Sequence, residues 1–304
     1  MSNLSKDAEQ PCNIDDSPGV VKLVITPKDK DLGGFSVRRA LPNRQCKKVG
    51  PWVFFDHMGP AQFPPGQGVN VRPHPHIHLA TVTYLFAGEI LHRDSLGSEQ
   101  AIRPGDVNLM VAGRGIVHSE RESEAVRNSS HSLEGLQLWL ALPQESEDID
   151  PAFYHYPSGE IPSVTVDQSQ VRVMMGEAYN VTSPVKTFAN TIYVEAHVQA
   201  GHTLLIPEAE ERALYVVEGE LSVDGQVVPK HAMAVIAQGP VSIEATQKSH
   251  VAVIGGEALP PRFIDWNFVS SRKECIAQAK EDWQARRFPL VPGDEEEFIP
   301  LPER

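Results

Sequence analysis

The chain has 304 residues, of which 41% are hydrophobic and 22% charged, a composition typical of a globular rather than a disordered protein. Its 40 acidic residues outnumber the 27 basic ones, and the formal net charge of -13 disfavours direct binding to nucleic-acid phosphates. The N-terminal stretch MSNLSKDAEQPCNIDD lacks the apolar core of a secretion signal, and no segment is apolar enough to span a membrane. We therefore expect a cytoplasmic protein, or a nuclear one if the source is eukaryotic, without membrane partners.

Short strand-like segments separated by glycine and proline run through the first half of the chain. After a loose tail at 1–17, apolar and polar residues alternate from Val20 to Thr26 and from Phe35 to Ala40, the period of half-buried strands. Further short strands are expected at 51–55, 72–86, 89–92, 107–112, 115–119 and 135–142. Many short strands with such turns predict a β-barrel or sandwich, which we place at 18–145.

A second strand-rich unit follows a proline-rich, acidic linker at 146–162. Its strands are expected at 164–175, 191–198, 203–206, 213–218, 220–223, 233–237, 241–245 and 250–254. Val217–Leu221 resembles Phe86–Ile90 as strand, turn and strand, which indicates a duplicated domain and a second barrel at 163–260. In the remaining segment, 261–304, we expect one helix and then a solvated acidic tail. The predicted fold is all-β, with two barrels in tandem and a C-terminal helix.

Neither the cysteines nor the basic residues form a pattern typical of a site. Cys12, Cys46 and Cys275 are odd in number and scattered, so we expect three unpaired thiols. The pairs Arg38-Arg39 and Lys47-Lys48 are short, and we expect them on the solvated surface rather than in a binding stripe.

Two pairs of alternating residues predict a metal site. His74 and His76 lie two apart on one expected strand and project from the same face. His118 and Glu120 are also two apart, on a strand that follows a glycine-rich turn. If the two strands face each other in a barrel, three imidazoles and one carboxylate meet around one ion.

The residues that follow the histidines set the expected surroundings of the site. His78 has the parity to point into the barrel, where it could orient one of the ligands. We expect apolar side chains of the same parity to line the barrel: Ala80, Val82, Tyr84 and Phe86. A dry wall of this kind suits a flat, mostly apolar ligand. His57, His92 and His131 are expected to be structural or surface residues.

The predicted ligand set limits the choice of metal and of chemistry. Three imidazoles and a carboxylate suit Fe(II), Mn, Ni, Cu or Zn, but not thiolate-preferring Cu(I). Four protein ligands in an octahedral shell leave two positions for a substrate oxygen and dioxygen, or for substrate and water. Glu120 is the expected catalytic residue, because besides holding the metal it could take the proton of a substrate hydroxyl.

Several stretches resemble a known family. Gly68, five residues before His74-Pro75-His76, and Gly115, three before His118, match parts of the two motifs of the cupin superfamily. Longer stretches are similar to the pirin family within it: Phe54–His57, Thr81–Tyr84, Pro104–Asp106, Gly113–Glu120, Gly135–Trp139 and, more weakly, Ile254–Leu259. The resemblance spans nearly the whole chain and is strongest in the first half.

This resemblance implies two cupin (jelly-roll) barrels and Fe(II) bound in the first barrel by the predicted ligands. The second barrel is expected to be metal-free, because Glu210-Glu211-Arg212 stands where a second His-x-His pair would lie. The sequence departs from the family twice. Ala80 and Thr81 occupy the place of a cupin glutamate, so that Glu120 must serve instead, and Ile77-His78 follows the motif where pirins more often have Arg-Gly.

Three functions follow as hypotheses. Some pirins cleave quercetin with dioxygen, which implies an iron-dependent dioxygenase acting on a flavonol or a related enediol-like aromatic. Eukaryotic pirins act as nuclear co-regulators, which implies a non-enzymatic, redox-sensing regulator with a protein partner. The third hypothesis is a cupin isomerase or storage-type barrel that holds zinc structurally. An open cavity over the metal would favour catalysis, and a sealed one the structural role.

Overall fold

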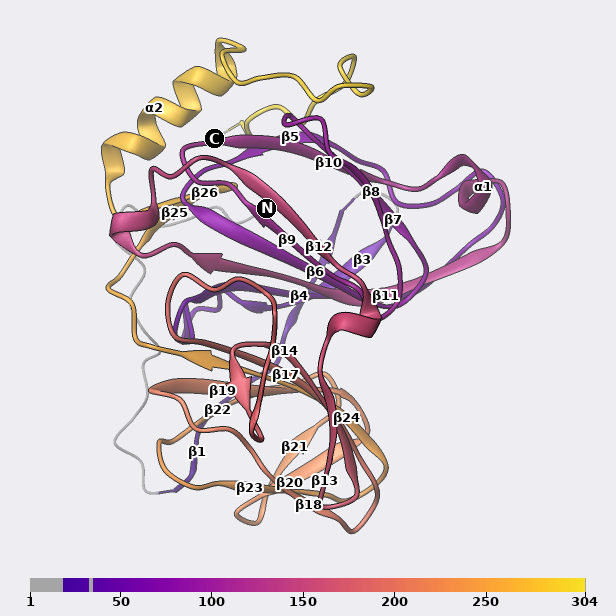
Figure 1. The fold of residues 1–304 in the computed structure, drawn as a ribbon, viewed down its shortest axis with the longest axis vertical. Helices are drawn as coiled ribbons and strands as arrows, with labels where there is room; N and C mark the ends of the chain where they lie inside the picture. The colour runs from indigo at the N-terminus through magenta and orange to yellow at the C-terminus, as the bar shows by residue number, and fades with distance from the viewer. Residues whose placement is uncertain (1–18, 33–34, 304) are drawn as a thin grey trace.

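Two antiparallel sheets form the first barrel in this computed structural model, which describes residues 19–32 and 35–303 (Figure 1). In pairing order, the larger sheet contains β12 (Ala152–Tyr156), β9 (Val107–Val111), β6 (Leu79–Ala87), β11 (His131–Ala141), β4 (Trp52–Phe63), β3 (Ser36–Leu41) and β2 (Lys28–Asp31). The smaller sheet contains β5 (Val71–His76), β10 (Ile116–Arg121), β7 (Ile90–Asp94) and β8 (Glu99–Ile102). In β7 the residues Ile90, His92 and Asp94 are buried and alternate with half-buried ones, the two-residue period of a strand.

The second barrel repeats this arrangement. Its larger sheet contains β1 (Val21–Ile25), β22 (Met233–Ile236), β19 (Glu211–Glu218), β24 (Ser249–Gly256), β17 (Thr191–Val198), β14 (Ser169–Met175) and β13 (Ser163–Val166). Its smaller sheet contains β18 (Thr203–Leu205), β23 (Ser242–Ala245), β20 (Glu220–Val223) and β21 (Gln226–Pro229). The strand orders of the two barrels correspond one for one, which confirms the prediction of an all-β fold with two barrels.

The remaining elements connect or cover the barrels. They are the hairpin β15 (Glu177–Ala178) and β16 (Val181–Thr182), the hairpin β25 (Phe263–Asp265) and β26 (Phe268–Ser270), the short helices α1 (Glu124–Arg127), η1 (Gln144–Ser146) and η2 (Ser158–Glu160), and the helix α2 (Lys273–Gln284). None of the helices in the described ranges is long and apolar enough to cross a membrane.

The expected domain boundaries are wrong for two strands. β1 lies within the range assigned to the first barrel but pairs with β22 of the second. β12 lies within the expected linker at 146–162 but pairs with β9 of the first barrel. Each is the edge strand of a seven-stranded sheet. By pairing with β22 or β9, it satisfies backbone groups of that neighbour that would otherwise lie unpaired at the edge of the sheet. Local sequence patterns do not reveal such pairing, because the partner strand is remote in the chain.

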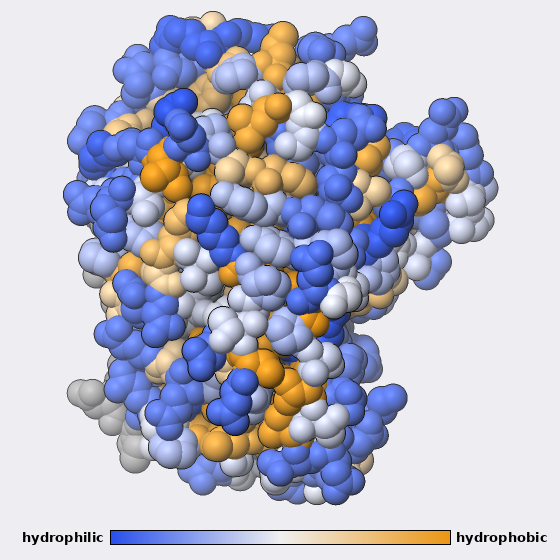
Figure 2. Space-filling view, viewed as in Figure 1, coloured by the Kyte–Doolittle hydropathy of each residue, from blue (hydrophilic) through white to orange (hydrophobic). Residues whose placement is uncertain are grey.

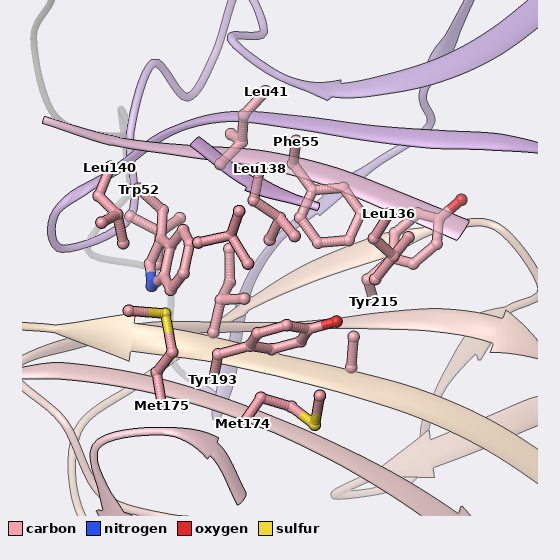
Figure 3. Close-up of a cluster of buried hydrophobic side chains, with 14 of the residues drawn as sticks. Leu41, Trp52, Phe55, Leu136, Leu138, Leu140, Met174, Met175, Tyr193 and Tyr215 are labelled. Atoms are coloured by element: carbon pink, nitrogen blue, oxygen red, sulfur yellow. The ribbon is translucent and has the colours of Figure 1, made fainter. Parts of the chain in front are cut away.

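The two larger sheets pack against each other and form the largest core. In Figure 3, Trp52 and Phe55 of β4 and the leucines of β11 face Met174, Met175 and Tyr193 from the second barrel. The indole Nε1 of Trp52 also donates to the main-chain oxygens of Ile192 (3.2 Å) and Gly255 (3.1 Å). This apolar contact joins the barrels tightly and gives the second barrel a packing role.

A break at Ile77-His78 splits the expected strand 72–86 into β5 and β6. His78 has a φ of 57°, in the left-handed region that favours glycine. The break reverses the parity of β6, so the residues expected to line the barrel interior instead belong to the core between the barrels or pack against it: Ala80, Val82, Tyr84 and Phe86. That prediction is therefore wrong.

The C-terminal helix is confirmed, but the tail is not simply solvated. Helix α2 buries Ile276, Ala279 and Trp283 in a core with Val117 of β10 and Phe268 of β26, and it lies beside the β25–β26 hairpin (Figure 1). After it, Asp294 forms a bidentate ion pair with Arg121 of β10 (2.6 and 2.7 Å), and Glu297 binds the same guanidinium at 2.8 Å. The end of the chain thus returns to the barrel that carries the predicted ligands.

Two expectations about the surface and the cysteines also need correction. Cys275 is a free thiol as expected, but Cys46 is disulfide-bonded, and Cys12 lies outside the described residues. Arg39 and Lys48, expected on the surface, are only 6% and 2% exposed. Figure 2 shows that the face in view is mostly hydrophilic, with apolar residues in scattered groups.

Candidate metal centre

His74, His76 and His118 meet inside the first barrel. The antiparallel register of β5 and β10 places His118 directly opposite His74. One ring nitrogen from each histidine lies within 4.8 Å of those of the other two, and all three side chains are buried. The alternation of β5 directs His74 and His76 to the same face. The predicted convergence of the two strands is thus present for the three imidazoles.

Hydrogen bonds prepare the imidazoles as ligands. Nδ1 of His74 donates to the Arg72 main-chain oxygen at 2.9 Å, and Nδ1 of His76 to that of Asn267 at 3.0 Å. A proton held on Nδ1 leaves Nε2 unprotonated, with its lone pair available for a cation. Both ring nitrogens of His118 are buried without a hydrogen-bond partner among the described residues, which is unusual unless a ligand satisfies one of them.

The electrostatic environment keeps the histidines neutral. Burial lowers the pKa of His74 to about 4. Burial also holds the pKa of His76 and of His118 well below its usual range, and the neighbouring imidazoles lower it further. Neutral imidazoles are the form that binds a metal ion. The donor set and its protonation therefore fit a divalent transition metal.

Glu120 lies beside the three histidines but is not part of the closest group. A register shift separates His118 from Glu120 where β10 pairs with β5, and Glu120 lies opposite Val71 on β5 and opposite His92 on β7. Its side chain lines the same cavity as the histidines, and burial raises the pKa of its carboxyl to about 7. Glu120 as the fourth ligand remains a proposal.

Two other histidines differ from the sequence-based expectation. His78 points away from the three ligands, and its Nδ1 bonds to Ser270 Oγ at 2.9 Å. His92, expected to be structural or on the surface, lies with its ring 5.3 Å from that of His118, and its Nε2 contacts Asp94 Oδ2 at 3.0 Å. The alternation of His92 and Asp94 resembles that of the ligand pairs and could have drawn attention to this strand.

A cavity of about 390 Å³ opens over the histidines. Its smaller-sheet side carries the histidines, Glu120 and Ile90, and its larger-sheet side carries aromatic and apolar side chains with a few polar ones: Val37, Arg39, Phe54, Asp56, Met58, Gln137 and Trp139. Trp266, Asn267 and Ile299 from the C-terminal segment also line the cavity. This volume lies in the range of small-molecule sites, roughly 300–1,000 Å³.

The corresponding position in the second barrel is filled with apolar side chains. Strands β18 and β23 correspond to β5 and β10, and they pair Leu204 with Ile243. Both residues are buried in the core of that barrel with Ile206 and Ala245. The place expected for a His-x-His pair, Glu210-Glu211-Arg212, instead leads into β19. Of the described residues, only the first-barrel histidines form a group able to hold a metal ion.

Comparisons with known proteins match both halves of the chain. A family model named Pirin covers residues 34–140, and a model named Pirin C-terminal cupin domain covers residues 193–289. A pirin-like protein of Caulobacter vibrioides is 47% identical over 289 residues, which are 93% of this chain and 100% of that protein.

Solved structures share the fold. The crystal structure of a quercetin 2,3-dioxygenase from Acinetobacter baumannii is 34% identical, with a TM-score of 0.86, and the match covers 93% of this chain and 95% of that one. A bacterial pirin from Escherichia coli in complex with nickel(II) has a TM-score of 0.61 at 18% identity, over 78% of this chain and 99% of that one. At that identity the second likeness concerns the fold alone.

Proposed function

Because this chain belongs to the pirin family, we propose that it is a metal-dependent dioxygenase of the quercetin 2,3-dioxygenase type. Its substrate would be a flavonol or a related aromatic with an enediol-like pair of oxygens. The similar Acinetobacter baumannii structure carries the name of that activity. Fold alone does not determine a reaction, so the proposal depends on the site.

The observation that carries the proposal is the cavity over the three histidines. A structural metal site is closed by its ligands, whereas a catalytic one keeps open positions that a substrate can reach. Here about 390 Å³ of space borders the histidines, and its walls include the stacked rings of Phe54 and Trp139, 4.0 Å apart. A flat aromatic molecule fits walls of this shape and polarity.

In the proposed site, each residue has a separate task. His74, His76 and His118 hold the metal, for which we propose Fe(II), and Glu120 supplies a fourth ligand. A divalent ion bound there would act as a Lewis acid toward a substrate hydroxyl. Glu120 accepts the proton that this hydroxyl releases, since its carboxyl lines the cavity beside the ligands. The apolar wall excludes water from the activated substrate.

Turnover of a flavonol tests the proposal. The protein is loaded separately with Fe(II), Mn(II), Ni(II), Cu(II) and Zn(II) and incubated with quercetin in air and without oxygen. We expect the flavonol absorbance to fall only in air, with at least one of these metals, and to persist when Glu120→Gln replaces the native protein. An unchanged absorbance in air with every metal would contradict the proposed function.

A further inference from the structure

A row of polar side chains crosses the inner face of the larger sheet, opposite the metal ligands. Cross-strand pairing places Thr83 beside Gln137, Gln137 beside Asp56, and Asp56 beside Arg39, on the four adjacent strands β6, β11, β4 and β3. Thr83 Oγ donates to Gln137 Oε1 at 2.9 Å. Arg39, Asp56 and Gln137 all line the cavity. This row thus brings polar groups to a wall that also carries the apolar side chains of Val37, Phe54, Met58 and Trp139.

Asp56 holds the Arg39 guanidinium in one orientation. Nε and Nη2 of Arg39 donate to the two carboxylate oxygens of Asp56 at 2.8 and 2.7 Å, a bidentate pair. The guanidinium carbon also lies 4.3 Å from the centre of the Phe54 ring. The two residues are only 6% and 3% exposed, so the pair is fixed by its surroundings rather than by solvent.

One nitrogen of this guanidinium donates no hydrogen bond within the described part of the chain. Among the described residues, Arg39 Nη1 is buried and has no hydrogen-bond partner. A buried donor without an acceptor is destabilising, and native proteins keep few of them unless a ligand or water completes the set. Since Arg39 lines the cavity, an oxygen atom of a bound molecule can satisfy this nitrogen.

A row of aromatic side chains connects the metal ligands to Arg39. The ring of His76 lies 5.0 Å from Trp139, Trp139 stacks on Phe54 at 4.0 Å, and Phe54 packs under the Arg39 guanidinium. Since Phe54 and Trp139 stack face to face, a bound molecule meets the edges of these rings, and one that lies across them has one end near the histidines and the other near Arg39. The histidines and Arg39 therefore lie at the two ends of one row of aromatic side chains.

We propose that Arg39 is the specificity-determining residue of the cavity, donating from Nη1 to a substrate oxygen at the end remote from the metal ligands. The preferred substrates are then flat aromatics with oxygen atoms at both ends, such as flavonols hydroxylated on their outer rings. This inference rests on the proposed function, because it assumes that the other end of the substrate lies at the histidines.

Binding without turnover tests this inference separately from the dioxygenase proposal. Metal-loaded protein is titrated without oxygen with 3-hydroxyflavone and with quercetin, which adds hydroxyls on the outer rings, and binding is followed by quenching of tryptophan fluorescence. We expect the native protein to bind quercetin about tenfold more tightly, the effect of roughly one charge-assisted hydrogen bond. Equal affinities for the two flavonols would overturn the inference.

Variants assign this preference to Arg39. Arg39→Met with Asp56→Leu removes the pair without leaving a buried charge, and it should bind the two flavonols equally. Arg39→Lys keeps the positive charge but loses the planar guanidinium with its several donors. This variant should lose most of the preference for quercetin over 3-hydroxyflavone. Arg38→Met is the matched control: Arg38 bonds to the Gly59 main-chain oxygen outside this cavity, and its replacement should keep the tenfold preference.

The outcomes separate the two proposals. A double variant that still prefers quercetin tenfold would overturn the role of Arg39. If the double variant does not fold, an Arg39→Lys variant that keeps this preference would overturn it instead. A protein that shows the preference but never degrades either flavonol would contradict the dioxygenase activity and leave the role of Arg39 supported. A native protein that binds neither flavonol would contradict both.

Discussion

In the first barrel β5 and β10 pair His74 with His118, whereas in the second the corresponding strands β18 and β23 pair Leu204 with Ile243. The strand orders of the barrels are the same, so the difference lies in the side chains that the corresponding strands carry. One barrel has a cavity where the other has a packed core. A duplicated fold can thus keep its chemistry in one copy and use the other for packing.

The second barrel still supports the site, although it holds no ligand group of its own among the described residues. Its larger sheet packs against the outer face of the first barrel's larger sheet, whose inner face lines the cavity. The chain that leaves it supplies the Asn267 main-chain oxygen to His76 and the Ile299 side chain to the cavity wall. Residues of the first barrel thus form the candidate metal site, and residues of the second barrel and the C-terminal segment hold that site in shape.

The largest expected effect is the loss of metal from the first barrel. His74→Ala, His76→Ala and His118→Ala together should reduce bound metal to background, because no described group elsewhere can hold an ion. The matched control replaces three second-barrel histidines, His197, His202 and His231, with alanine and should keep the native metal content. Metal analysis after loading and desalting checks both, with circular dichroism to confirm folding. Native metal content in the first variant would break the comparison.

Next in size is the effect of core truncation in the second barrel. Leu204→Ala should destabilise the metal-free protein by about 2–5 kcal/mol, because Leu204 is 1% exposed in a packed core. His74→Ala should cost about 1 kcal/mol or less, since the side chain already borders a cavity. Urea unfolding of the metal-free variants measures both. Equal losses of stability would show that the two positions have the same role.

A smaller effect is expected where the end of the chain binds the first barrel. Asp294→Asn should weaken its ion pair with Arg121 and destabilise the local docking of residues 288–301 by about 1–2 kcal/mol, since the Asp294 carboxylate is largely buried. Hydrogen exchange of this segment measures the change. Glu296→Gln, at an exposed position, is the control and should leave exchange unchanged. Equal exchange in Asp294→Asn and native protein would show that the ion pair does not hold the segment.

The smallest effect is a pH dependence from the second barrel. Burial, with Arg38 and His57 nearby, lowers the pKa of His231 to about 4, against about 6.5 in the unfolded chain. Between these values the unfolded state binds more protons, so stability is lost as the pH falls from 6.5 to 4. His231→Asn, which tolerates the φ of 62°, should lose less stability between pH 7 and pH 5 than the native protein. Urea unfolding midpoints measure the two losses. An equal loss of stability in His231→Asn and in the native protein would contradict protonation of His231 as the cause.

Sequence alone predicted the features that depend on neighbours in the chain. The alternation of His74 with His76, on the strand that became β5, was enough to place both imidazoles on one face. His118 could be added because a strand pattern of the same kind surrounds it. The two-barrel architecture followed from the spacing of strands and from the family resemblance, and both family models match.

Features that depend on contacts between remote segments could not be predicted. Arg39 and Asp56 are 17 residues apart, and only the pairing of β3 with β4 makes them a buried ion pair on the cavity wall. The exchange of edge strands β1 and β12 likewise depends on partners far along the chain. His78 is instructive because its positive φ breaks the strand, although a histidine at this position gives no sign of a break in the sequence.

The most direct test is to locate the metal by anomalous diffraction at its absorption edge, in crystals of the metal-loaded protein. We expect a single strong peak per chain, at a metal ion bound by His74, His76 and His118 in the first barrel and by the Glu120 carboxylate. A peak within the second barrel, or no peak among these three histidines, would contradict the central claim. A peak there without contact to Glu120 would contradict only its role as the fourth ligand.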